Sequence, residues 1–329
     1  MEKYVSLLNE FDTQNAIAFV KDKFAKELCD SLDLSRVSAP LFVKRESGLN
    51  DDLNGVERPV SFDILETGEM AEVVHSLAKW KRMALLKYNF PIHTGLYTDM
   101  NAIRRDEECD SIHSLYVDQW DWEKIILAED RTEDYLKATV RSIYGAVLRT
   151  AKEISKKYPA IDCYLPEQIF FIDTYQLEEM YPDLTPKQRE YEITKEKGAV
   201  FLMKIGGRLK NGQKHDGRAP DYDDWNLNGD ILIYNITIDC AFEISSMGIR
   251  VDRESLLKQL KIENKEERLK YEFHSMLVSG ALPLTIGGGI GQSRLCMLLL
   301  HKAHIGEVQV SIWPEKEINK CKSMGINLL

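Results

Sequence analysis

Two long amphipathic helices, with strand-like segments between and after them, constrain this fold more than any other feature of the sequence. Behind Asp12 and Thr13, which are possible caps, apolar residues recur at steps of three and four: Ile17, Val20, Phe24, Leu28 and Leu32. A second helix is predicted over about residues 132–158, with one stripe formed by Leu136, Val140, Ile143, Val147 and Ile154. Each stripe needs an apolar surface to pack against.

The strand-like segments form hairpins and do not alternate with helices. Segments 95–103 and 113–120 flank an acidic loop, 104–110, and segments 229–235 and 239–246 are only three residues apart. The run 34–43 is also strand-like, and Pro40 inside it predicts an edge, a bulge or an interface. A glycine-rich loop over 287–291 is expected to open an apolar helix at 295–300. We therefore predict an α/β (α+β) fold in which a mostly antiparallel sheet is flanked by helices.

Composition narrows the class of protein. The 329 residues carry a formal charge of −10 and 44% hydrophobic residues, which fits a single domain over 1–329 and disfavours a protein that mainly grips a phosphate backbone. We see neither an apolar run long enough for a bilayer nor a secretory signal, so we expect a cytoplasmic protein without a membrane partner. The six cysteines are scattered, which disfavours zinc and disulfides, and His301 and His304 are interpreted as polar residues at a helix end.

Two arginines stand where a nucleotide could be bound. Arg294 follows the glycines in the pattern G-x-G-x-G-x-x-R, although an exposed arginine after a tight turn is an alternative. Arg104 ends a predicted strand, where it could bind a phosphate or carboxylate, and a surface ion pair with Asp106 or Glu107 is the alternative. With the first helix and Pro40, these features follow the order of the three motifs of class II aminoacyl-tRNA synthetases.

Five longer blocks make the resemblance specific. Segments 74–82, 116–122, 218–225, 243–250 and 285–294 resemble the ammonia-dependent asparagine synthetases, the aspartate–ammonia ligases of type A. The link at 225–228 is short where family members can carry a longer loop, which leaves the cover of the nucleotide site open. A tRNA-charging paralogue or a non-catalytic regulator of class II type is the alternative function, and neither spare chain nor positive charge favours a tRNA-binding module.

The resemblance implies a reaction and its partners. ATP would activate the β-carboxylate of L-aspartate as β-aspartyl-adenylate with release of pyrophosphate, and ammonia would then displace AMP to give L-asparagine. It also implies Mg²⁺, a homodimer whose interface is built by the first motif, and no nucleic-acid partner.

The resemblance also implies site residues. Catalysis is assigned to Asp51, Arg104 and Gln119, and substrate binding to Asp51, Lys81, Gln119, Ser246 and Arg250. Nucleotide binding is assigned to Arg104, Ser114, Asp223, Ser245, Gly289, Gly291 and Arg294, and Mg²⁺ to Asp230 and Glu243. Several have a plainer interpretation: Asp51 as a turn residue, Lys81 as a solvated helix charge, and Asp230 and Glu243 as water-facing carboxylates. Ser114, Asp223, Ser245 and Ser246 could instead make capping or strand-edge hydrogen bonds. Asp221 and Asp224 are interpreted as loop charges.

Overall fold

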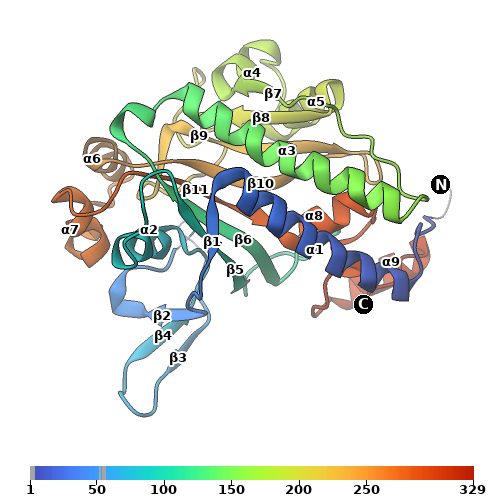
Figure 1. The fold of residues 1–329 in the computed structure, drawn as a ribbon, viewed down its shortest axis with the longest axis horizontal. Coiled ribbons are helices and arrows are strands. Elements are labelled where there is room, and N and C mark those ends of the chain that lie inside the picture. Colours follow the sequence, from blue (N-terminus) through green and yellow to red (C-terminus); the bar gives the residue numbers. More distant parts are fainter. Residues whose placement is uncertain (1–3, 52, 54–56) are drawn as a thin grey trace.

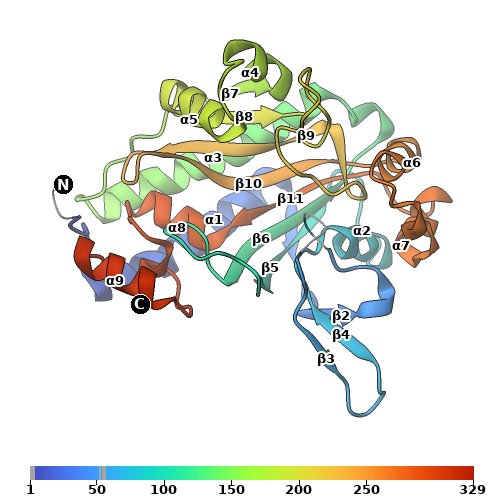
Figure 2. The same cartoon turned by 180° about the vertical axis from the view of Figure 1, so that it is seen from behind.

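A twisted eight-stranded sheet forms the centre of the molecule (Figures 1 and 2). The computed structural model describes residues 4–51, 53 and 57–329, and the strand count refers to these residues. The strand order is β1 (Leu34–Arg36), β5 (Gly95–Ile103), β6 (Tyr116–Ile125), β11 (Thr285–Gly291), β10 (Cys240–Arg250), β9 (Asp223–Asn235), β8 (Ala199–Met203) and β7 (Phe170–Asp173). The inner pairs are antiparallel, and only the pairs β1–β5 and β7–β8 at the two edges are parallel within this sheet. The predicted mostly antiparallel sheet is confirmed.

Both predicted long helices are present on one face of this sheet. They are α1 (Glu10–Leu32) and α3 (Glu133–Lys157). The short apolar helix α8 (Gln292–Leu299) packs on the same face. Their apolar stripes meet the sheet, where the rings of Phe24 and Trp120 lie 4.7 Å apart. Thr132 caps α3, but α1 begins one turn earlier than predicted, because the side chain of Asn9 accepts the N–H of Asp12.

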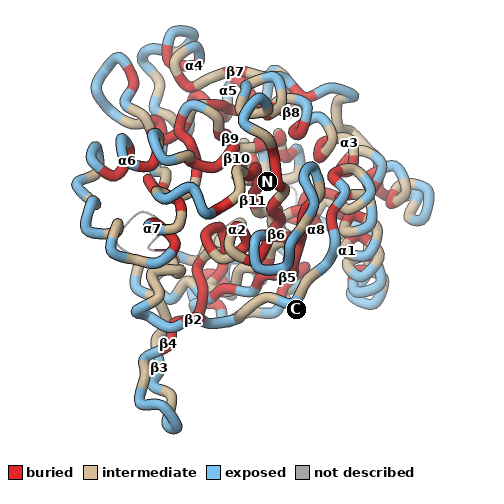
Figure 3. The backbone as a smooth tube through the Cα atoms, turned by 60° about the vertical axis from the view of Figure 1, so that its left-hand side comes forward, coloured by how far each residue is buried: buried red, intermediate tan, exposed pale blue. Residues whose placement is uncertain are grey.

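The remaining helices lie around the sheet and at its ends. They are α2 (Ala78–Lys87), α4 (Thr174–Met180), α5 (Pro186–Lys197), α6 (Arg253–Ile262), α7 (Glu272–Val278) and α9 (Glu315–Met324). Among them α2 packs on the sheet face opposite α1 and α3. Figure 3 shows the buried residues concentrated along the strands of the large sheet. In the described part of the chain, no helix combines the length and the apolar character that crossing a membrane requires.

Three local predictions are wrong. The run 34–43 is not one strand, because the chain breaks around Pro40 into β1 and β2 (Phe42–Lys44), and β2 belongs to a small sheet with β4 (Met70–Val73) and β3 (Ser61–Asp63). Both strands nevertheless lie at an edge of their sheets, as Pro40 predicts. This small sheet projects from the body of the molecule in Figure 1. The glycine-rich segment 287–291 is not a loop, because it forms most of the inner strand β11. Residues 225–228 are not a link between two elements, because they lie inside the continuous strand β9.

Candidate functional site

A polar cavity of about 470 Å³ opens on the sheet face opposite α1 and α3. Strands β6, β9, β10 and β11 contribute to its lining, together with α2, the segment after β5 and the segment before β9. It is lined by these predicted residues: Lys81, Arg104, Ser114, Gln119, Asp223, Asp230, Glu243, Ser245, Ser246, Arg250, Gly289, Gly291 and Arg294. One cavity thus collects residues that are up to 213 positions apart, from Lys81 to Arg294.

Asp51 is the one predicted site residue that does not line the cavity among the residues described. Asp51 is 3% exposed, its Oδ1 accepts the backbone N–H of Leu53 at 3.0 Å, and it lies near Tyr222, which does line the cavity. Burial and the neighbouring Asp51 raise the pKa of Tyr222. The Asn/Asp-rich stretch 50–55 lies partly outside the described residues, so the structure places Asn50, Asp51 and Leu53 but not residues 52, 54 and 55.

Glycines in β11 make room for side chains of β6. Residues 287, 289 and 291 face the same side of the sheet as their partners Glu123, Asp121 and Gln119. A Cβ at Gly287 would lie 2.5 Å from Cδ of Glu123, and a Cβ at Gly289 would lie 2.9 Å from Cδ of Gln119. The glycines therefore serve close approach across the sheet and not a left-handed loop, because none of those in β11 has positive φ.

Arg250 lies at the floor of the cavity between two carboxylates. Its Nε and Nη2 donate to Glu123 at 3.0 and 2.8 Å, and its Nη1 donates to Asp223. Although burial alone would raise the pKa of Glu123, the charges of Arg250 and Lys81 hold that pKa below its usual value. Counting the hydrogen bonds among described residues, two of the five N–H donors of Arg250 remain for a ligand.

Lys81 is fully buried, so its interpretation as a solvated helix charge is wrong. Its ammonium donates to the carboxylate of Asp121 and to the carbonyl oxygens of Trp122 and Gly288, the last two at 2.8 and 3.2 Å. These three acceptors match the three N–H bonds of an ammonium group. Lys81 therefore offers the cavity its positive charge and not a free donor.

Arg104 and Arg294 bring further positive charge to the cavity wall. Arg104 follows β5, and its closest carboxylate among the described residues is Glu107 at 3.6 Å, while its buried Nε has no hydrogen-bond partner in the described part of the chain. Asp106 pairs with Arg58 instead. Arg294 lies in the first turn of α8 as predicted, and donates to the carbonyl oxygen of Glu243 at 3.0 Å.

Carboxylates gather near the hairpin of β9 and β10. Asp230 accepts from Arg218 at 2.6 Å, and Arg218 also donates to the hydroxyl of Ser246. Burial raises the pKa of Asp230 to about 7, and although Arg218 lowers it, Glu243 nearby raises it further. A β-bulge between Glu243 and Ser245 re-aims this strand, so that both residues and Ser246 line the cavity. Two carboxylates whose repulsion is only partly neutralised can hold a divalent cation.

Sequence reasoning missed several polar residues of the site. Arg218, Tyr222 and Asp121 line the cavity, and all lie inside the blocks that carry the resemblance. Period-two alternation from Gln119 could have found Asp121 and Glu123. Asp221 and Asp224 are not loop charges: Asp221 is fully buried beside Arg268 and His274 at 2.8 and 3.0 Å, and Asp224 pairs with Arg131 at 2.9 Å.

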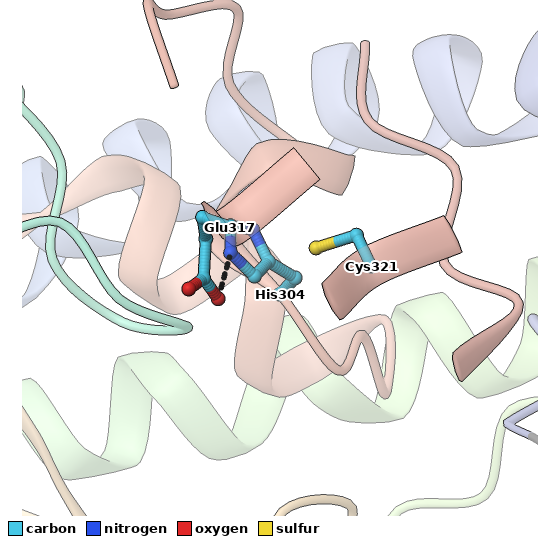
Figure 4. Close-up of side chains that lie close together, drawn as sticks. All are labelled: His304, Glu317 and Cys321. Carbon is cyan, nitrogen blue, oxygen red and sulfur yellow. Dashed lines mark ion pairs between the residues drawn. The ribbon is translucent and has the colours of Figure 1, made fainter. Parts of the chain in front are cut away.

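A second group of potential metal ligands, His304, Glu317 and Cys321, lies where α9 packs on the segment after α8 (Figure 4). Nδ1 of His304 accepts the backbone N–H of Gly306 at 2.9 Å, so the neutral ring carries its proton on Nε2. That nitrogen lies 3.3 Å from Glu317. A protonated Nε2 binds a carboxylate and not a metal ion, so this group ties α9 to the body of the protein.

Comparison with known proteins identifies the family. The family model for aspartate–ammonia ligase matches residues 11–325. The chain belongs to the aspartate–ammonia ligase family. It is 62% identical over 329 residues to the aspartate–ammonia ligase of Clostridium tetani, covering all of this chain and 96% of that one. It is 59% identical over 326 residues to the ligase of Fusobacterium nucleatum, covering 99% of each. This chain is therefore an enzyme of the aspartate–ammonia ligase class, as the resemblance implied.

Solved structures confirm the fold of this ligase. The chain matches the asparaginyl-tRNA synthetase of Pyrococcus horikoshii complexed with asparaginyl-adenylate with a TM-score of 0.67 at 14% identity, covering 92% of this chain and 70% of that one. A putative aspartyl-tRNA synthetase from Leishmania major Friedlin matches with a TM-score of 0.62 at 17% identity, covering 91% and 64%. The predicted class II synthetase-like core is therefore confirmed.

Proposed function

We propose that this ligase makes L-asparagine from L-aspartate and ammonia in two steps at the cavity described above. A carboxylate oxygen of aspartate attacks the α-phosphorus of ATP, which forms β-aspartyl-adenylate and releases pyrophosphate. Ammonia then attacks the activated carbonyl carbon, and AMP leaves with the electron pair of the broken carbon–oxygen bond. The observation that carries this proposal is the single cavity in which Arg104 and Arg294 offer charge for phosphate while Arg250 offers free donors for a carboxylate.

The nucleotide end is assigned to Arg104 and Arg294. The buried Nε of Arg104 lacks a partner among described residues, so this arginine can neutralise charge that develops on the α-phosphate and the attacking carboxylate. Arg294 at the start of α8 is assigned to the distal phosphates or the adenine face. Ser114, Asp223, Ser245 and the strand around Gly289 and Gly291 complete the proposed nucleotide-binding surface.

The amino-acid end is assigned to the floor of the cavity. Arg250 binds the α-carboxylate through its two remaining N–H donors, Lys81 contributes charge beside it, and Ser246 borders this region. At the reacting end, the amide of Gln119 orients the carboxyl group and the incoming nitrogen. Asp51 is assigned to attract ammonium or take its proton from its position beside Tyr222, outside the described cavity lining, because only neutral ammonia can attack.

Asp230 and Glu243 are assigned to Mg²⁺. The raised pKa of Asp230 fits this assignment, because a divalent cation would relieve the repulsion between the two carboxylates. Both groups offer the hard oxygen ligands that Mg²⁺ prefers. When bound, the ion would neutralise phosphate charge during adenylation.

One assay tests the reaction. The purified protein receives aspartate, ATP, Mg²⁺ and ammonium, and the products are separated by chromatography. We expect asparagine, AMP and pyrophosphate in equal amounts. ADP and phosphate in their place, or asparagine formation that does not depend on ammonium, would refute the proposal.

We further propose that the chain acts as one catalytic domain, forms a homodimer through the region of α1, β1 and Pro40, and works in the cytoplasm. Light scattering of the purified protein tests the dimer, and a monomer at assay concentration would contradict it. Membership of the ligase family favours this function over a tRNA-charging paralogue or a non-catalytic regulator.

A further inference from the structure

We infer that Glu123 is the positioning residue that fixes Arg250 for recognition of the α-carboxylate of aspartate. This inference rests on the proposed function. Glu123 is fully buried in β6 and is not part of the cavity lining, which includes Arg250 directly in front of it. It would therefore act on the substrate only through the arginine.

The contacts of Glu123 define the plane of the guanidinium group. Its two oxygens accept from Nε at 3.0 Å and from Nη2 at 2.8 Å, which is the side-on, bidentate arrangement of an arginine–carboxylate pair. The carboxylate of Asp223 accepts a hydrogen bond from Nη1 on another side of the guanidinium group. With three nitrogens engaged in this way, the guanidinium cannot rotate, and its remaining donors keep a fixed direction before the substrate arrives.

Glu123 is itself held by two further groups, Thr285 and Lys81. The hydroxyl of Thr285 donates to its Oε1 at 2.7 Å, and the ammonium of Lys81 lies 3.6 Å from its Oε2. Because burial disfavours the charged form, these donors are needed to keep the carboxylate ionised. An ionised Glu123 is in turn what keeps Arg250 oriented by charge-assisted hydrogen bonds.

The backbone is built around this pair. Glu123 and Gly287 are register partners in β6 and β11. A Cβ at position 287 would lie 2.5 Å from Cδ of Glu123 and 2.7 Å from Nη2 of Arg250, so any residue larger than glycine would displace the pair. An inner strand usually gains from a side chain at such a position. The glycine is explained by the space that Glu123 and Arg250 occupy.

The experiment compares Glu123→Gln with wild-type protein and with Glu178→Gln. Glutamine keeps the size of Glu123 but removes the charge. Glu178 is also a buried carboxylate that accepts N–H groups, at Lys210 and Asn211, and it lies outside the cavity lining. We expect the KM for aspartate to rise about ten- to a hundredfold in Glu123→Gln, because charge-assisted hydrogen bonds to Arg250 are lost. The KM values for ATP and ammonium should stay within about twofold, and Glu178→Gln should match wild type.

Inhibition by β-alanine separates positioning from a structural role. This compound keeps the amine and the reacting carboxylate of aspartate but lacks the α-carboxylate. Its inhibition constant should be the same in wild type and in Glu123→Gln, because it makes no use of Arg250. If Glu123→Gln does not fold, Glu123→Asp, which keeps the charge but shortens the side chain, replaces it in the same comparison.

Two results would overturn the inference. One is an unchanged KM for aspartate in the variant. The other is an equal rise in the KM for aspartate, the KM for ATP and the inhibition constant of β-alanine. Failure of the proposed function is distinguishable from either. In that case wild type and Glu178→Gln would themselves make no asparagine.

Discussion

Two neighbouring glycines of β11 should respond very differently to the same change. Alanine at position 287 places a methyl group 2.5 Å from Cδ of Glu123 and 2.7 Å from Nη2 of Arg250, both of which are buried. Alanine at position 289 places its methyl group 2.9 Å from Cδ of Gln119, which lines the cavity and is only partly buried. The first methyl meets a fixed ion pair, whereas the second meets the end of a side chain that can move into open space.

The magnitudes follow from these surroundings. For Gly287→Ala, overpacking costs about 1–3 kcal/mol, and disturbing a charged hydrogen-bonded pair costs about 1.5–3 kcal/mol more. We therefore expect a loss of roughly 3–6 kcal/mol in the free energy of unfolding, which is a large part of the ~5–15 kcal/mol that a domain has. For Gly289→Ala we expect a loss of less than about 1.5 kcal/mol, because Gln119 can rotate away.

Denaturant unfolding followed by tryptophan fluorescence measures the free energy of unfolding of both variants. The rate of asparagine formation measures their activity. Gly289→Ala should fold normally yet lose most of its activity, because Gln119 no longer points toward the reacting group. Gly287→Ala should lose stability and, in the fraction that folds, show a raised KM for aspartate. Equal stabilities for the two variants would refute the reasoning, because it would mean that Glu123 and Arg250 are as mobile as Gln119.

Three further outcomes are expected. Arg104→Ala should lower kcat/KM by about a hundred- to a thousandfold. The free energy of unfolding should change by less than ~0.5 kcal/mol, since the closest carboxylate to Arg104 is 3.6 Å away. A loss of unfolding free energy large enough to account for the lost activity would contradict this. Asp230→Asn should raise the Mg²⁺ concentration for half-maximal activity about tenfold, and wild type should lose activity in EDTA and regain it with excess Mg²⁺. Asp221→Asn should destabilise the fold by about 3–5 kcal/mol at pH 7, because it removes the carboxylate that faces the buried ammonium of Lys79 at 3.6 Å. Lys79 and the hydrogen bond from His274 outweigh burial and lower the pKa of Asp221, so its contribution is present above the unfolded pKa of about 3.9 and falls as pH drops below it. The stability gap between wild type and Asp221→Asn should therefore narrow in urea titrations run below about pH 4, and a gap that widens there would contradict the assignment.

Helices and hairpins could be predicted because their signals are local. The stripe from Val20 to Leu32 is visible within one segment, and the helix forms because that stripe meets the sheet. The hairpin of β9 and β10 could be predicted for the same reason, because only three residues separate the two predicted segments. The full lengths of these strands could not be predicted. Polar residues such as Asp223 and Arg250 end the apolar pattern, whereas the pairing continues across the sheet.

The glycine-rich segment was misread because its explanation lies elsewhere in the chain. Three consecutive glycines favour a loop in any local reading, since glycine weakens a strand. In the structure β11 is held between β6 and β10, and the side chains that need its missing Cβ atoms are Glu123 and Gln119. These residues lie more than 160 positions earlier in the sequence. The resemblance assigned the segment to the nucleotide site, and in the structure Gly289 and Gly291 line the cavity, although the resemblance did not show that the segment is a strand.

The buried cations of α2 show how far local patterns can mislead about charge. A solvated helix charge was the alternative interpretation of Lys81, yet Lys79, Lys81 and Arg82 are each no more than 3% exposed. Their acceptors come from distant segments: the carbonyl of Asn50 for Lys79, Asp121 for Lys81, and the carbonyls of Pro283 and Val251 for Arg82. Burying a charge without partners would cost far more than a helix can recover, so these contacts must form together with the fold. The helix therefore fixes the relative positions of β6, β11 and the segments that border the cavity. Because the same contacts stabilise the fold and orient the site, substitutions in α2 should affect stability and catalysis together, unlike those at Arg104.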